Sequence, residues 1–154
     1  EHDTSSENRQ RGYHAALTDA DIKPQASLIV SGEYTFNSGS ERTSTLLGQQ
    51  QPPTAIFACN DEIASGALFA ARIKQVAVPQ QLSIVGFEDS PFSRQSWPKL
   101  TTAHQPNSEI AANAARILIE SIRSSRQGNT DKDPARMGFQ PEIVVRGSTC
   151  PAAT

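Results

Sequence analysis

The chain has 154 residues, which suits one domain of moderate size with a hydrophobic core of its own. Apolar residues make up 36% and charged residues 19%, a composition typical of a globular protein. The formal net charge is −2, so the sequence lacks the basic balance expected of a domain that itself grips DNA. It also lacks an apolar run of the roughly 20 residues that a membrane-spanning helix requires.

The first part of the chain predicts two helices separated by a strand. The apolar spacing predicts a helix over 9–20 and a short strand over 27–30. A second helix is expected to open near Ser38, because Ser38 and Glu41 have the spacing of a capping box. A pair of prolines then ends this unit.

The middle of the chain continues the alternation. Residues 54–58 predict a strand buried on both faces, because the run is apolar without alternating. Asn60 or Asp61 caps the next helix, which extends to about residue 75, and 82–87 predicts another buried strand. Helices that alternate with strands in this way favour an α/β fold with a parallel sheet flanked by helices.

The last part departs from this alternation. The predicted segments are an irregular loop over 88–99, a short strand over 100–103, a long helix from Asn107 or Ser108 to Arg126, a polar stretch over 127–134, a last strand over 142–146 and a disordered tail over 148–154.

Sequence signatures of catalysis and metal binding are absent. The chain contains no G-x-S-x-G, P-loop, G-x-G-x-x-G or H-E-x-x-H motif. Its histidines have no zinc spacing, and the sequence places no nucleophile beside His104, the one near the predicted cleft. Cys59 and Cys150 are expected to be a small buried hydrophobe and an exposed thiol, a usage that favours a reducing cytoplasm. We therefore predict no metal, no cofactor and no enzymatic activity.

Polar side chains instead follow the predicted strands. Asn60 ends one strand, and Glu88 and Asp89 end the next, so an amide and carboxylates should meet at the carboxyl edge of the sheet. Arg9 adds a planar five-donor group and Tyr34 a flat apolar face. This mixture suits the hydroxyls and the C–H face of a sugar.

Each of these residues also has a simpler interpretation, which the sequence leaves open. Asn60 and Asp61 can be helix caps, Glu88 and Asp89 turn-forming acids, Arg9 a solvated helix residue and Tyr34 a packed loop aromatic. Their placement at successive strand ends is stronger support than any single residue.

Four motifs resemble the LacI/GalR family of sugar-responsive transcriptional regulators, and the resemblance extends from about residue 5 to residue 147. The motifs are RQRGYHAAL at 9–17, AIFACNDEIASGAL at 55–68, VPQQLSIVGFED at 78–89 and PKLTTAHQ at 98–105. The resemblance implies the second lobe of a periplasmic-binding-protein-like fold, truncated, from a repressor without its helix-turn-helix headpiece. The residues that it assigns to the effector site are Ser5, Arg9, Tyr34, Asn60, Glu88 and Gln105. The family usually carries aspartate where this chain has Glu88, so the carboxylate is kept but displaced by about one bond length.

The resemblance also implies a division of the chain and a set of partners. Residues 1–105 would form the C-terminal lobe, 106–134 a crossover helix of the missing first lobe, 135–147 a returning strand and 148–154 a tail. The implied partners are a sugar or sugar phosphate, a second copy of the chain, and operator DNA bound through the missing headpiece. Candidate dimer contacts are Phe36, Phe92 and Trp97, with the alternative that Phe92 and Trp97 pack their own loop. The apolar face of the 107–126 helix, formed by Ile110, Ile117, Leu118 and Ile122, should then pack on another copy or fold onto the remaining lobe.

Two other classes compete with this interpretation. A periplasmic sugar-binding protein of a transport system shares the fold and the polar sheet edge. A sugar-processing hydrolase would need paired acids, but Glu88 and Asp89 are adjacent on a strand end and should point apart.

Overall fold

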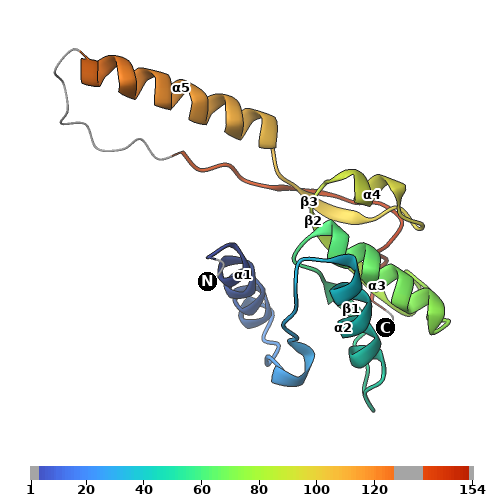
Figure 1. Cartoon of the computed structure of the whole chain (residues 1–154). Helices are drawn as coiled ribbons and strands as arrows, with labels where there is room; N and C mark the ends of the chain where they lie inside the picture. The colour runs from blue at the N-terminus through green and yellow to red at the C-terminus, as the bar shows by residue number, and fades with distance from the viewer. Residues whose placement is uncertain (1–3, 127–136, 153–154) are drawn as a thin grey trace.

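The computed structural model describes residues 4–126 and 137–152. The helices and strands are, in chain order, α1 (Thr4–Asp19), the 3₁₀ turn η1 (Ala26–Leu28), α2 (Phe36–Leu47), β1 (Ala55–Phe57), α3 (Asp61–Ile73), β2 (Ser83–Glu88), α4 (Pro91–Gln95), β3 (Thr101–His104), α5 (Asn107–Arg126) and β4 (Glu142–Val144) (Figure 1). Within the described ranges, no helix is both long enough and apolar enough to cross a bilayer.

The strands form one mixed sheet in the order β1-β2-β3-β4. The β1–β2 and β2–β3 pairs are parallel, which confirms the predicted parallel arrangement, whereas β3 and β4 are antiparallel. His104, at the end of β3, lies opposite Glu142, at the start of β4. The chain therefore leaves the sheet for α5 at the carboxyl end of β3 and returns to the sheet at that same end. Strand β4 consequently runs antiparallel to β3.

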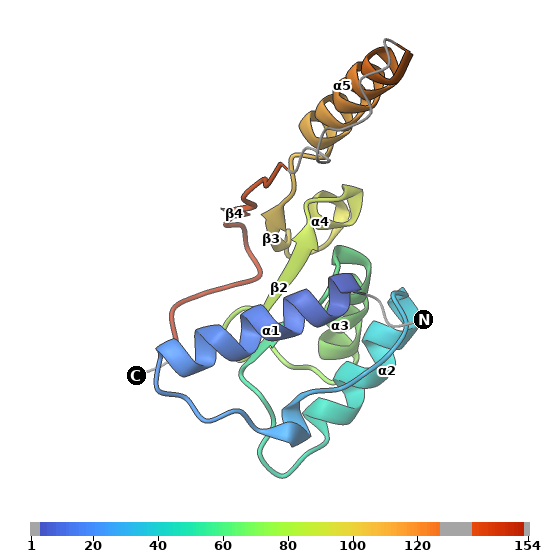
Figure 2. The same ribbon diagram turned by 90° about the vertical axis from the view of Figure 1, so that its left-hand side faces the viewer.

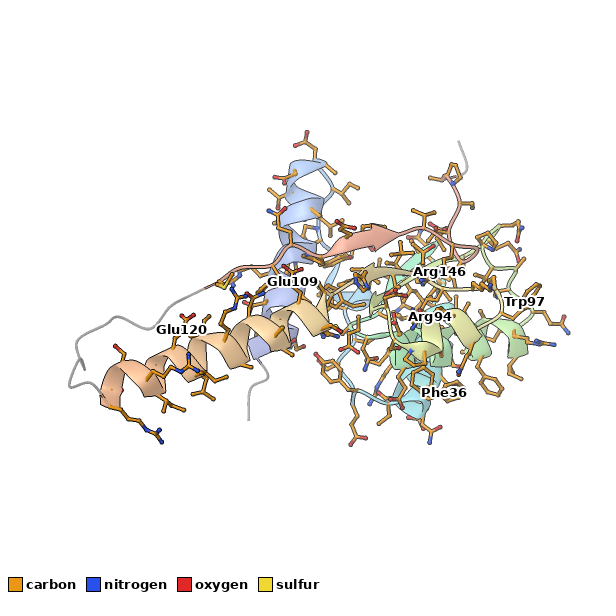
Figure 3. The ribbon with its side chains drawn as sticks, turned by 90° about the horizontal axis from the view of Figure 1, so that it is seen from above. Phe36, Arg94, Trp97, Glu109, Glu120 and Arg146 are labelled. Carbon is orange, nitrogen blue, oxygen red and sulfur yellow. The ribbon has the colours of Figure 1, made fainter. Side chains whose placement is uncertain are left out.

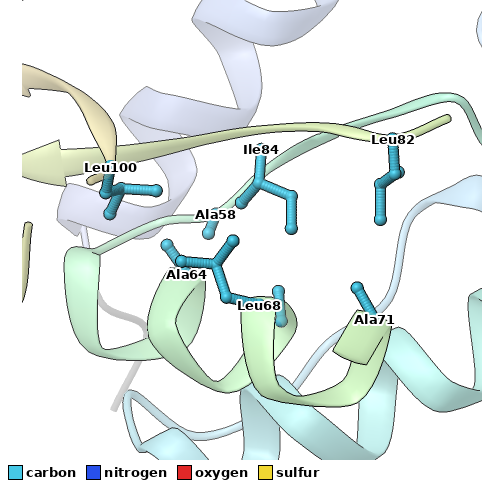
Figure 4. Close-up of a cluster of buried hydrophobic side chains, with 8 residues drawn as sticks. Ala58, Ala64, Leu68, Ala71, Leu82, Ile84 and Leu100 are labelled. Atoms are coloured by element: carbon cyan, nitrogen blue, oxygen red, sulfur yellow. The ribbon is translucent and has the colours of Figure 1, made fainter. Parts of the chain in front are cut away.

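The core lies between α3 and the sheet. The apolar stripe of α3 recurs at helical spacing and meets the buried side chains of the strands. The cluster consists of Ala58, Ala64, Ala67, Leu68, Ala71, Leu82, Ile84 and Leu100 (Figure 4). Small residues on α3 bring this helix close to β2, and the predicted helix and strand are both confirmed.

Helix α2 packs closely against α3 because a glycine faces it. A Cβ atom on Gly66 would lie 2.1 Å from the carbonyl oxygen of Phe36, too close for any side chain. Helix α2 begins at Phe36, where the Thr35 hydroxyl accepts a hydrogen bond from Ser38 N at 3.2 Å. The predicted start at Ser38 is therefore wrong by two residues, and Thr35 is the cap.

The strand predicted over 27–30 is wrong, and so is the burial predicted for 54–58. Residues 26–28 form η1, followed by extended backbone at Ile29. Strand β1 is then the edge of the sheet, and Phe57 is 40% exposed. A strand is buried on both faces only when neighbouring elements cover both faces. One face of β1 is only partly covered, and the apolar run in the sequence does not show this.

Two C-terminal predictions have different outcomes. The tail is not disordered at its start: Ser148 is fully buried, donates to the carbonyl of Ile84 at 2.6 Å and accepts from Thr101 N at 2.8 Å. Helix α5 is confirmed and projects away from the α/β body (Figures 1 and 2). Its apolar face is largely uncovered, with Leu118 61% exposed. The polar stretch predicted over 127–134 and the last two residues lie outside the described ranges.

The loop predicted over 88–99 contains a short helix, α4. Its Ser93 side chain is fully buried, and the hydroxyl donates to the carboxylate of Asp89 at 2.8 Å and contacts the carbonyl of Ser90 at 2.7 Å. The contacts of Ser93 with Asp89 and Ser90 therefore stabilise a helix in a segment where the spacing of prolines and aromatic residues predicted no helix or strand.

Candidate functional site

The candidate site is built where the parallel strands end side by side. Strand β1 leads into Cys59, β2 ends at Glu88 and β3 ends at His104, with Glu88 and His104 in register. The polar groups of neighbouring strand ends are thereby delivered to one edge of the sheet, which is the usual ligand edge of α/β proteins.

Arg9 from α1 reaches this edge and is held there by three groups. Its Nη1 donates to the carbonyl of Cys59 at 2.8 Å, and its Nη2 lies 3.8 Å from Glu88 Oε1. The guanidinium carbon lies 4.3 Å from the centre of the Phe87 ring. Only 11% of the Arg9 side chain is exposed. The arginine is therefore fixed against an aromatic face and is not a solvated helix residue.

Glu88 is the acidic partner in this group. Burial raises the pKa of its carboxyl, the Arg9 guanidinium lowers it, and the carboxylate of Asp61 raises it further, with a net increase above the ordinary value. The charged form of Glu88 is thus less favourable here than in water. Its side chain still keeps 38% of its surface exposed, so it can meet a ligand from solvent.

An open hollow lies beside this pair. It is lined by Ser5, Asn8, Arg9, Gly12, Tyr13, Ala16, Phe57, Phe87 and Gln105. Among the predicted effector residues, Ser5, Arg9 and Gln105 therefore share one surface, and Glu88 adjoins it through Arg9. The hollow combines aromatic walls with a few polar groups, as sites for small ligands usually do.

Asn60 and Tyr34 are placed differently. The Asn60 side-chain oxygen accepts from Ile63 N at 2.7 Å, so this residue caps α3, although it follows directly after the Cys59 carbonyl that holds Arg9. Tyr34 lines an adjoining cavity of about 270 Å³ formed by α1, residues 28–34, α2 and β1, which shares Tyr13 and Phe57 with the hollow. The structure thus brings together Ser5, Arg9, Glu88 and Gln105, and places Tyr34 in the adjoining cavity.

Asp61, for which the sequence indicated no effector role, is completely buried beneath the site. Its Oδ2 accepts from Ser90 N at 2.7 Å and its Oδ1 accepts from the Thr102 hydroxyl at 2.6 Å. A Cβ atom on Gly86 would lie only 2.3 Å from Oδ1. In the sequence, Asp61 appears as an acidic residue in the first turn of α3. Acidic residues are common there because they interact favourably with the helix dipole, so the sequence did not single Asp61 out as a support for the site.

Asp89 is the second acidic residue whose role the sequence left open. Its carboxylate accepts from Arg146 Nη2 at 2.6 Å and from the Ser93 hydroxyl at 2.8 Å. Arg94 Nη1 and His104 Nδ1 each lie 3.3 Å from its other oxygen. Burial works to raise the pKa of Asp89, but these hydrogen bonds and the two arginine charges outweigh it and hold the pKa below the ordinary value.

The two adjacent acids point to different partners, as predicted: Glu88 faces Arg9, and Asp89 faces Arg146. Ser93 donates to Asp89 and not to His104, so the hydroxyl, the carboxylate and the imidazole are not in the order of a catalytic triad. In the described part of the chain, no group of three metal-ligating side chains is gathered.

The candidate dimer residues lie elsewhere on the body. Trp97 is 83% exposed and Phe92 is 42% exposed. The Phe36 ring packs against Phe69 with centroids 5.5 Å apart. Figure 3 shows Trp97 at the end of the body away from α5, and Phe36 on another side.

Comparison with known proteins agrees with this fold. The family described as "Periplasmic binding protein-like domain" matches residues 1–149. The chain belongs to this family. One similar protein is the HTH-type transcriptional regulator DegA of Bacillus subtilis. It is 38% identical over 151 residues, which cover 98% of this chain and 43% of DegA.

Solved structures of LacI-type regulators share the fold. A transcriptional regulator from Bacillus cereus subsp. cytotoxis has a TM-score of 0.87 with 28% identity, over 97% of this chain and 51% of that structure. The regulator CelR, solved in complex with cellobiose, has a TM-score of 0.83 with 28% identity, over 91% of this chain and 41% of that structure. The chain therefore spans about half or less of the length of these proteins, and the part it matches is their effector-binding region.

Proposed function

We propose that this chain is the effector-binding portion of a sugar-responsive transcriptional repressor of the LacI/GalR type. The observation that supports it most is Arg9, held against Phe87 and beside Glu88 at the carboxyl edge of the parallel strands. Its relatives are transcription regulators, which also favours a cytoplasmic protein without catalytic activity over a transport protein or a hydrolase.

The chemistry of the hollow supports a neutral sugar as the effector. The Glu88 carboxylate can accept from hydroxyls, the remaining Arg9 donors can serve ring oxygens, and Phe57 and Phe87 offer faces to C–H groups. Among the described residues that line the hollow, Arg9 is the one cation, and its charge already faces Glu88. A phosphorylated sugar would bring a second anion to this carboxylate, so we favour the neutral form on this half of the site.

The regulatory mechanism follows from an incomplete cleft. The effector would bridge Arg9 and Glu88 to groups on a second lobe outside this chain, with Ser5 and Gln105 completing the contacts on this lobe. A bridging ligand binds the closed arrangement better than the open one and shifts the population accordingly. Operator DNA would be bound by a headpiece outside this chain, and homodimerisation would use Phe36, Phe92 and Trp97.

The test is a calorimetric screen of neutral and phosphorylated sugars against the complete protein and its variants. We expect Arg9→Ala and Glu88→Gln each to weaken the best sugar by about 30- to 100-fold, the loss of one charge-assisted hydrogen bond. Arg72→Ala is the control, because Arg72 is exposed on α3 and does not line the hollow. Wild-type affinity in both site variants would refute the assignment.

The isolated 154-residue chain provides a second test. Because it offers only one wall of the cleft, we expect it to bind the same sugar weakly or not at all. Binding as tight as that of the complete protein would contradict the bridging mechanism.

A further inference from the structure

Asp89 occupies a junction between the candidate effector carboxylate and the chain segments that lead to α5. Its own carboxylate, only 10% exposed, receives donors from α4 through Ser93 and from the segment after β4 through Arg146. His104, the last residue of β3, lies 3.3 Å away on the other oxygen. Three separate parts of the chain therefore meet at the residue that follows Glu88.

Arg146 extends this junction into the sheet. Its Nη1 donates to the carbonyl of Leu100 at 2.9 Å, and its backbone N donates to the Thr101 hydroxyl at 2.9 Å. The chain leaves the sheet for α5 just after His104 and returns through β4 just before Arg146. Asp89 therefore binds the returning connection through Arg146 and lies beside the outgoing connection at His104.

The backbone at this point adopts a conformation that needs such support. Glu88 has φ of 106° and Asp89 has φ of 53°, a left-handed pair without a glycine. Such conformations are strained for residues other than glycine and persist when the surrounding contacts hold them. On one side Asp89 is held by Arg146 and Ser93, and on the other Ser90 N donates to Asp61.

We infer that Asp89 is a positioning residue: it holds Glu88 in its left-handed conformation and ties the Glu88 carboxylate to the segments that lead to and from α5. The role of Glu88 as an effector ligand rests on the proposed function, but the positioning by Asp89 does not. A ligand that changes the backbone of Glu88 must then also change the contacts of Arg146 and His104. This provides a physical connection from the hollow to α5.

The experiment needs no effector, so its result is independent of the proposed function. The carboxyl pKa of Glu88 is measured by NMR titration of the 154-residue chain labelled at the glutamate side-chain carbons, with Glu88→Gln to assign the signal. Exchange of the Ser90 amide hydrogen is followed in the same samples. The variants are Asp89→Asn, Arg146→Lys and, as matched control, Arg94→Gln, which removes the exposed partner of the same carboxylate.

We expect Asp89→Asn to lower the pKa of Glu88 toward its ordinary value, because a relaxed loop returns the carboxylate to water. The Ser90 amide should exchange about tenfold faster or more. Arg146→Lys should act in the same direction and keeps the test valid if Asp89→Asn fails to fold. Arg94→Gln should leave both quantities near wild type, since an exposed ion pair contributes little.

A residue that merely stabilises α4 gives a different result. In that case Asp89→Asn and Arg146→Lys lower the melting temperature, while the pKa of Glu88 and the exchange of the Ser90 amide hydrogen, relative to global unfolding, stay at wild-type values. That outcome would overturn the inference, as would an Arg94→Gln variant that matches Asp89→Asn.

Discussion

Replacing Asp61 by alanine tests whether the buried carboxylate supports the whole candidate site. Asp61 has no exposed surface, and it is the acceptor for Ser90 N at 2.7 Å and for the Thr102 hydroxyl at 2.6 Å. Alanine removes both acceptors and leaves both donors without these partners in a region closed to water. It also opens a void beside Gly86, whose missing side chain makes room for the carboxylate.

The magnitude follows from these two contacts. Hydrogen bonds to a charged group contribute about 1.5–3 kcal/mol each, and Asp61 accepts two of them, from Ser90 N and the Thr102 hydroxyl. We therefore expect Asp61→Ala to lower the free energy of unfolding by about 3–5 kcal/mol. Asp61→Asn keeps the shape and one acceptor, so about 1.5–3 kcal/mol is expected. Thr102→Val, which removes a single donor, should cost about 1–2 kcal/mol.

Urea denaturation followed by circular dichroism measures these differences, with the exposed Arg72→Ala on the same helix as control. The loss of unfolding free energy should be largest for Asp61→Ala, smaller for Asp61→Asn and smallest for Thr102→Val, and this order tests the reasoning as well as the individual values do. An Asp61→Ala variant within about 1 kcal/mol of wild type would refute the reasoning, because the desolvation of the carboxylate would then offset its hydrogen bonds.

Four further predictions concern stability and self-association. Gly66→Ala should destabilise it by about 1–3 kcal/mol in urea denaturation, because the new methyl group meets the Phe36 carbonyl and forces α2 away from α3; unchanged stability would mean that α2 moves freely. Asp89 binds a proton less readily when folded, so stability should fall as pH drops below the ordinary aspartate pKa, and Asp89→Asn should flatten that slope in denaturation series from pH 7 to 3. The pKa of Glu88 is raised, so its charge opposes folding at neutral pH, and Glu88→Gln should leave stability at pH 7 equal or higher; a loss of stability would contradict this sign. Trp97→Ala should keep the melting temperature, since 83% of the side chain is exposed, but should reduce any dimer seen by analytical ultracentrifugation of the complete protein; an unchanged dimer would remove Trp97 from the interface.

The sequence predicted helices and strands correctly where the apolar residues recur with the period of the element that forms. The apolar spacing in α3 and α5 and the run before Glu88 gave these helices and the strand nearly to the residue, because helix and strand periodicity is a local property. The failure at 27–30 has the opposite origin. Its β-forming residues become a strand only if they pair with a neighbour, and here they lie beside a cavity of about 270 Å³ instead.

The sequence predicted only part of the site, because contacts between distant residues do not follow from local patterns. Arg9, Glu88 and Gln105 could be selected from motifs and strand ends, and the structure brings them to one edge. Asn60 was selected as a ligand and forms a cap, because an amide at a helix start satisfies both patterns equally well.

The sequence by itself determined the alternation of helices and strands and the polar ends of the strands, since each depends on residues that are close together in the chain. Only the tertiary structure decided which acid faces which arginine, why the tail at Ser148 is buried, and how Asp61 and Asp89 support the site. The Asp61–Thr102, Asp89–Arg146 and Ile84–Ser148 contacts join residues that are 41, 57 and 64 positions apart. No local pattern encodes such partners, because they are selected by the packing of the sheet and not by the spacing of the residues.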